Sequence, residues 1–333
     1  MAFFDGIYGN GKQKAYFSSL IKEGKCAHAY ILEAPAGAGK KAFALHLAAA
    51  LASLEASAES EKKCRRILDG ISPDVMMLRR EEGKKSIGVE SVRDFCAGVY
   101  LTPSELDFKM YIFDEADRIT PQAQNALLKI IEEPPADVYM LLLCENSLSL
   151  LSTVRSRAQK IALEVFDEEA LRFYARQNGL CETENEEKLS FAIRMSGGTI
   201  GALKALLQDE AFAFSAYTAA RKVIDGQVAK DRGVSYFDFL KQISDFLTTR
   251  DALEALTAYL LSAYGDLMRA QSAEKIRASF FTADEADELS MLFTTSALAK
   301  SFAAVDGIRS DMRFNTNLSL TAALLAMALW SAV

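Results

Sequence analysis

One stretch near the N-terminus constrains the fold more than any other part of this 333-residue chain. A short apolar run at residues 29–32 is followed by a Gly- and Ala-rich turn and then by a helical pattern that continues to about Leu54. This strand–loop–helix order is typical of a phosphate-binding loop, in which backbone N–H groups and a lysine hold a polyphosphate at a helix N-terminus. We therefore expect a nucleotide site built around this loop.

The loop matches the pattern only in part. Gly37, Gly39 and Lys40 stand where the pattern requires them, whereas Ala34 replaces its first glycine and Lys41 replaces its last residue, a Ser or Thr. That hydroxyl is a ligand of Mg²⁺ in working enzymes, and a lysine would repel the cation. We expect a loop that keeps its shape, could still hold ATP or ADP weakly, and regains some Mg²⁺-dependent binding when Lys41 is changed to Thr.

Strand and helix signals alternate through the first half of the chain. Short β-like runs occur at 29–32, 75–78, 110–113, 138–144 and 160–163. Helical periodicity fills the intervals, which predicts an α/β fold with a parallel sheet and crossover helices. The clearest helix is 121–133, because Thr120 can cap it, Pro121 suits its first position and two prolines follow it. Its apolar face, which we interpret as core, consists of Ala123, Ala126, Leu127, Ile130 and Ile131.

Strand signals cease after Leu163. We predict three domains: an α/β domain at 1–165, a small helical lid at 166–208 and a helical domain at 209–333. The apolar run at 318–333 is too short to span a bilayer and is expected to be a buried terminal helix.

Composition excludes several classes of protein. Half of the residues are apolar and the net charge is −7, which is ordinary globular composition and argues against a dedicated nucleic-acid binder. The N-terminus lacks the features of a signal peptide, so we expect a cytoplasmic protein. An odd number of scattered cysteines without paired spacing favours neither disulfides nor zinc; they are Cys26, Cys64, Cys96, Cys144 and Cys181.

Two further motifs bear on nucleotide chemistry. Asp114 and Glu115 follow an apolar run, as do the Mg²⁺-binding and water-orienting acids of phosphate-loop enzymes. Arg155 and Arg157 lie just before the last predicted strand. An arginine pair in a loop is usually surface charge, but in ring-forming ATPases an arginine at this place enters the neighbouring subunit's site.

Taken together, these residues resemble the bacterial clamp-loader ATPases of the AAA+ class, and within it the delta-prime branch. The most specific segment runs from Asp114 to Pro135, and the segment from Arg155 to Ala158 is similar to the family's Ser-Arg-Cys motif with Ala158 in place of Cys. The resemblance covers roughly residues 4–203. It implies a RecA-like AAA+ domain, a helical lid and an all-α collar that packs in a ring.

Two more departures from the family pattern separate this chain from an active motor. Gly201 stands where the motor subunit carries an arginine that senses the γ-phosphate. Of the four cysteines of the family's zinc module only Cys64 remains, with Ala58 and Glu61 at two of the other positions. A single thiolate cannot complete a tetrahedral zinc site, so we expect no zinc.

The resemblance implies a clamp-loader stator, with little ATPase activity of its own, that places Arg157 as an arginine finger in an adjacent motor subunit. The implied partners are the tau/gamma and delta subunits and, through the complex, the sliding clamp and primed DNA. Two alternatives remain open: an active tau/gamma-like ATPase and an AAA+ adaptor outside replication. ATP turnover by the isolated protein and co-purification with its partners would separate them.

Overall fold

The protein is described here by a computed structural model, which covers residues 4, 6–53, 57–81, 83–180, 186–230, 233–272, 279–311 and 317–333. The chain forms two compact units. The first consists of Met1–Phe166 with Thr199–Gly201, and the second of Asp167–Gly198 with Ala202–Val333. A finer division of the second unit into lid and collar stays a prediction.

The first unit is built on a parallel sheet of five strands in the order β2-β3-β4-β1-β5. The strands are β1 (Ala29–Glu33), β2 (Val75–Leu78), β3 (Lys109–Phe113), β4 (Val138–Cys144) and β5 (Gln159–Ala162). Residues of β3 and β4 are buried on both faces, as expected of central strands in a sheet covered on each side by helices.

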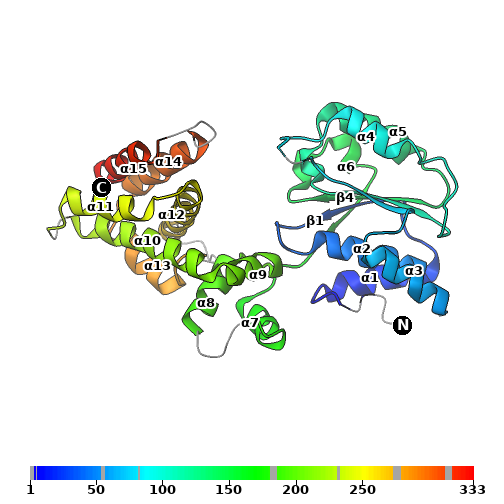
Figure 1. Ribbon diagram of the computed structural model, residues 1–333, viewed down its shortest axis with the longest axis horizontal. Coiled ribbons are helices and arrows are strands. Elements are labelled where there is room, and N and C mark those ends of the chain that lie inside the picture. Colours follow the sequence, from blue (N-terminus) through cyan, green and yellow to red (C-terminus); the bar gives the residue numbers. More distant parts are fainter. Residues whose placement is uncertain are drawn as a thin grey trace. The chain divides into compact units, whose positions relative to one another are not determined.

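Helices cover both faces of this sheet (Figure 1). On one face lie α1 (Gly11–Glu23), α2 (Lys40–Ala52) and α3 (Ala58–Leu68), which pack with alternate strand residues such as Tyr30 and Ile112. On the other lie α4 (Val89–Cys96), α5 (Pro121–Glu132) and α6 (Ser152–Arg155), which pack with the intervening residues such as Ile31 and Tyr111. Two short 3-10 helices, η1 (Ala116–Arg118) and η2 (Ser147–Ser149), follow β3 and β4.

The described part of the second unit contains helices and no strands. They are α7 (Glu168–Gln177), α8 (Glu186–Met195), α9 (Ile200–Gln208, whose first two residues group with the first unit), α10 (Glu210–Val228), α11 (Tyr236–Phe246), α12 (Arg250–Gln271), α13 (Ala283–Ser290), α14 (Thr295–Asp311) and α15 (Leu318–Ala332). The central helix is α12, whose buried residues pack in one cluster with α10, α14 and α15.

The predicted fold class is confirmed: five parallel strands in the predicted places, crossover helices and a helical C-terminal region. Thr120 caps α5, accepting a hydrogen bond from the backbone N–H of Ala123, and of the predicted core face only Ala126 is partly exposed. The predicted terminal helix is present, but it is buried on one face and not all round. In α15 one face is buried, but Leu320, Leu324 and Met327 are 61%, 46% and 54% exposed.

The helix after the loop ends at Ala52, and Leu54 lies outside the described residues. Within the described ranges, every helix is too short or too polar to cross a membrane.

Candidate functional site

The loop after β1 has the backbone shape of a phosphate-binding loop. The N–H of Ala34 donates to the carbonyl of Cys144 at 3.1 Å, which ties the start of the loop to β4. Gly37 and Gly39 have φ angles of 77° and 83°, in the left-handed region that residues with a Cβ rarely adopt. Helix α2 begins immediately afterwards at Lys40, so the chain turns sharply from strand to helix as the sequence predicts.

Lys40 is engaged with the loop itself. Its Nζ donates to the carbonyl oxygens of Ala34 at 2.6 Å and of Pro35 at 3.0 Å. The ammonium group therefore bridges two carbonyls of the tight turn, of which that of Pro35 also accepts the N–H of Ala38 at 3.2 Å. Lys41, the residue in place of the usual hydroxyl, is exposed to solvent.

Asp114 and Glu115 lie at the same edge of the sheet, because β3 and β1 are parallel and both flank β4. Each carboxylate is paired with an arginine from the end of β2. Arg80 binds Glu115 through two bonds, Nε to Oε2 at 3.0 Å and Nη2 to Oε1 at 3.3 Å. The Nε of Arg79 lies 3.6 Å from Oδ2 of Asp114, whose Oδ1 accepts the N–H of Glu115 at 3.1 Å.

The ligand that this fold implies is a Mg²⁺–nucleotide, and the residues present do not fit it. Mg²⁺ is bound in such sites by carboxylate oxygens, water and phosphate, with close to ideal octahedral geometry. Here Lys41 replaces the loop hydroxyl, and the carboxylates of Asp114 and Glu115 form ion pairs with arginine guanidinium groups. We therefore derive no hydrolytic step at this chain's own loop.

Gly201 contacts the loop. Its N–H donates to the carbonyl of Gly37 at 2.9 Å, and Thr199–Gly201 group with the first unit. A Cβ at position 201 would lie 2.7 Å from Cα of Gly37 and 2.8 Å from its carbonyl oxygen, closer than real Cβ atoms approach. A side chain at position 201, such as an arginine, could therefore not be accommodated without a shift of the backbone.

Arg157 lies just after α6, on the surface of the first unit. Its Nε is 2.9 Å from Oε1 of Glu132 at the end of α5, and its Nη1 donates to the carbonyl of Thr153 at 3.0 Å. The arginine and glutamate side chains are 40% and 45% exposed. Arg157 is thus accessible but partnered within its own unit, and its role as a finger stays a prediction.

Sequence reasoning missed Arg79 and Arg80. A signal was present, because the two arginines directly follow a predicted strand, and strands that run parallel end at one edge of the sheet. What the sequence did not give was that β2 and β3 are neighbours. Only that pairing brings an arginine doublet beside an acidic doublet.

Ala58, Glu61 and Cys64, the three positions compared with the family's zinc module, all lie on α3. Cys64 is on α3, where its Sγ lies 3.3 Å from the carbonyl of Ala49, and partial burial raises the pKa of its thiol. Within the described ranges no group of three potential metal ligands of the His, Cys, Asp or Glu type occurs. Cys181 lies outside those ranges.

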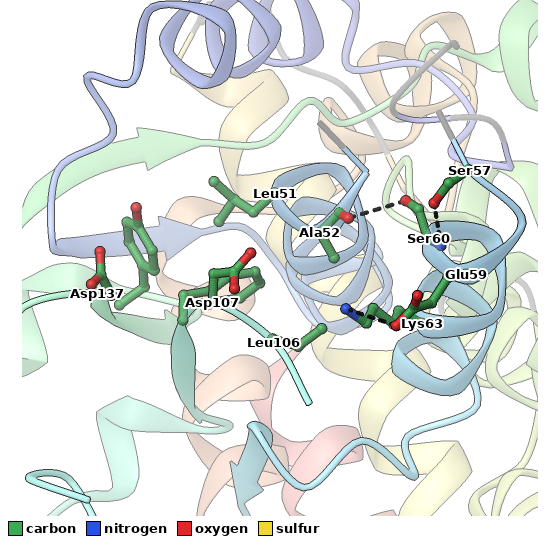
Figure 2. A pocket seen from close by; sticks show the side chains of 11 residues that line it. Leu51, Ala52, Ser57, Glu59, Ser60, Lys63, Leu106, Asp107 and Asp137 are labelled. Atoms are coloured by element: carbon green, nitrogen blue, oxygen red, sulfur yellow. Dashed lines mark hydrogen bonds and ion pairs between the residues drawn. The ribbon is translucent and has the colours of Figure 1, made fainter. Parts of the chain in front are cut away.

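A cavity of about 390 Å³ lies between the end of α2 and the start of α3 (Figure 2). It is also lined by Asp107 and Asp137, which precede β3 and β4. The cavity is therefore at the amino edge of the sheet, opposite the loop. Glu59 on its wall is paired with Lys63 at 3.6 Å.

The comparisons with known proteins point to one family. Residues 9–167 match the family model described as DNA polymerase III, delta subunit. The delta-prime subunit of Pseudomonas aeruginosa is 35% identical over 192 residues, which are 56% of this chain and 58% of that protein. The delta-prime subunit of Bacillus subtilis is 33% identical over 161 residues, 47% of this chain and 48% of that protein. Over residues 9–167 the chain matches this family model, and it is similar to delta-prime subunits of DNA polymerase III.

This confirms the resemblance inferred from the motifs. A DNA polymerase III tau subunit of Bacillus subtilis is also similar, 28% identical over 219 residues that cover 64% of this chain and 38% of that protein. The chain spans about half the length of the delta-prime relatives it matches. The family model covers most of the sheet-containing unit of this chain, and the 219-residue similarity to the tau subunit extends beyond that unit.

Proposed function

We propose that this chain is a clamp-loader subunit of the delta-prime type. It would act in the cytoplasm beside tau/gamma-like and delta-like subunits, which together use ATP to load a sliding clamp onto primed DNA. Its own role would be that of a stator that hydrolyses little or no ATP. The observation that supports this role is the pairing of Asp114 and Glu115 with arginines beside a loop that carries Lys41.

The stator would contribute Arg157 to the ATP site of an adjacent motor subunit. A guanidinium that reaches a γ-phosphate stabilises the charge that develops in phosphoryl transfer, and such fingers are worth about 10³–10⁵ in rate. The pair with Glu132 is no obstacle, because an ion pair between half-exposed side chains contributes about 1 kcal/mol or less. A polyphosphate on a neighbouring subunit could compete for the guanidinium.

The test is to assemble the complete complex with wild-type or variant chain and to measure ATPase activity and clamp loading. Arg157→Ala is expected to remove the turnover of one site, and so to lower total ATPase by a fraction and clamp loading more strongly. Arg157→Lys should not rescue, because lysine lacks the planar fork of donors. Arg155→Ala is the matched control, since Arg155 is an exposed arginine two residues away.

Glu132→Gln separates the finger from a purely structural role. It breaks the pair with Arg157 but leaves the guanidinium in place. If the finger assignment is right, Glu132→Gln keeps wild-type ATPase activity and loading. If Glu132→Gln instead reproduces the loss seen with Arg157→Ala, or if Arg157→Ala changes neither activity, the finger assignment fails.

A further inference from the structure

The arginine pairs at the edge of the sheet are set by strand register. Leu78 pairs with Phe113 at the ends of β2 and β3, and the N–H of Asp114 donates to the carbonyl of Leu78 at 2.9 Å. The next two residues of each strand therefore leave the sheet side by side. Arg79 and Arg80 come beside Asp114 and Glu115 as a consequence of the fold.

Arg80 is held on more than one side. Besides its two bonds to Glu115, its Nη1 donates to the carbonyl of Lys84 at 2.6 Å, which closes the loop that follows β2. A guanidinium that makes paired bonds to one carboxylate is positioned more firmly than a single-contact ammonium would be. The Arg80 side chain is 32% exposed.

A simpler interpretation is that these are ordinary surface ion pairs, which usually contribute little. Two features speak against it. Both carboxylates of the motif are paired at once, and each partner comes from the strand end adjacent to it. A divalent metal would have to displace both guanidinium groups and then remain close to their charge.

We propose that Arg79 and Arg80 exclude divalent metal from Asp114 and Glu115. The site then rejects Mg²⁺ at two separate places, at the loop through Lys41 and at the carboxylates through the arginines. Changing Lys41 to Thr removes only the first barrier and leaves the second intact. This inference deepens the proposed stator role, on which it rests.

The probe is Mn²⁺ alone, titrated into the full-length protein and followed by the loss of the free-ion signal in electron paramagnetic resonance. Four proteins are compared: wild type, Lys41→Thr, the double variant Arg79→Gln/Arg80→Gln, and the triple variant that combines them. The matched control is Arg66→Gln. It breaks the ion pair between Arg66 and Glu105, which is comparable to the pair between Arg80 and Glu115. The N–O distance is 2.9 Å and the side chains are 36% and 35% exposed, but this pair is not near the phosphate-binding loop.

The expected result is a gain in Mn²⁺ affinity of about tenfold or more in the double variant, since two guanidinium partners no longer compete. The triple variant should bind at least as tightly, whereas Lys41→Thr and Arg66→Gln should resemble wild type. Adding Asp114→Asn and Glu115→Gln to the double variant must abolish the gain, which assigns the bound ion to these carboxylates.

Two results would overturn the proposal: no gain in the double variant that circular dichroism shows to be folded, or a full gain from Lys41→Thr alone. A gain that survives removal of both carboxylates would also overturn it. The stator role can fail separately, because the test of Arg157 measures turnover in a neighbouring subunit's site and does not involve these carboxylates.

Discussion

Asp74 gives the sharpest test of what holds the first unit together. It precedes β2, is 1% exposed, and accepts backbone N–H groups from the segment that leads into β3. Its Oδ1 accepts from Ser104 at 2.8 Å, and its Oδ2 accepts from Ser104 at 3.0 Å, Glu105 at 2.6 Å and Leu106 at 2.9 Å. One buried carboxylate thus anchors three consecutive residues.

The cost of Asp74→Asn follows from these contacts. Asparagine can keep one carbonyl oxygen in the place of Oδ2, but its NH₂ group then faces the N–H of Ser104. Hydrogen bonds to a charged acceptor contribute about 1.5–3 kcal/mol and neutral ones about 1 kcal/mol. The contact at Oδ1 is lost and the three at Oδ2 become neutral, so we expect a loss of about 3 kcal/mol or more in the free energy of unfolding.

The two units can be followed separately in one urea titration. Trp330, the single tryptophan of the chain, is in α15 of the second unit, where its ring lies 5.2 Å from that of Phe239. Tryptophan fluorescence therefore reports the second unit, whereas circular dichroism reports both. Asp74→Asn should move the dichroism transition of the first unit by about 1 M urea or more and leave the fluorescence midpoint unchanged.

Two variants frame this result. Asp107→Asn is the control, because Asp107 is an exposed carboxylate near the anchored segment. Asp266→Asn is the equivalent substitution in the second unit, where the buried Asp266 accepts the N–H groups of Ser279, Phe280 and Phe281 at 2.9, 2.7 and 3.1 Å. It should move the fluorescence midpoint. If Asp74→Asn costs no more than Asp107→Asn, the reasoning about the anchor is refuted.

Two further predictions concern other buried or paired groups. Gln227→Leu should destabilise the second unit by about 2–4 kcal/mol in fluorescence-detected unfolding, because it leaves the hydroxyl of Tyr264 and the carbonyl of Leu329 without the bonds of 2.7 and 2.8 Å that Gln227 makes; an unchanged midpoint would contradict this. Although partial burial acts to raise it, bonds from Lys160 and Ser147 hold the pKa of Glu33 below its ordinary value of 4.5. A lowered pKa stabilises the folded state above the unfolded value, so the stability difference between wild type and Glu33→Gln should be constant above about pH 5 and shrink as the pH falls below 4.5; a difference independent of pH would refute it.

The strands and the helix at 121–132 could be predicted because their signals are local. Short apolar runs between helical segments predicted the strands, and Thr120 with Pro121 predicted the start of α5. Buried Gln124 was not foreseen. Its side chain joins the carbonyl of Ile119 to the N–H of Leu151, a link between distant segments that helical periodicity cannot reveal.

At the candidate site, too, the sequence predicts local features but not long-range contacts. The loop shape at Gly37 and Gly39 follows from local sequence, and the structure reproduces it. The partners of Asp114 and Glu115 depend on which strands are neighbours, and that depends on the packing of the whole sheet. That these two carboxylates are paired with arginines could therefore be learned only from the folded structure.

The retained loop has a physical explanation that does not require nucleotide. The Nζ of Lys40 satisfies the carbonyls of Ala34 and Pro35, and the N–H of Gly201 satisfies that of Gly37. Each contact fixes the turn between β1 and α2, the connection that places α2 against the central strands. A loop of this shape can therefore persist for its structural role after Mg²⁺ binding is lost. It follows that a phosphate-loop pattern predicts the local fold more securely than it predicts catalysis. Whether such a loop can bind Mg²⁺ depends also on the partners of Asp114 and Glu115, which follow β3.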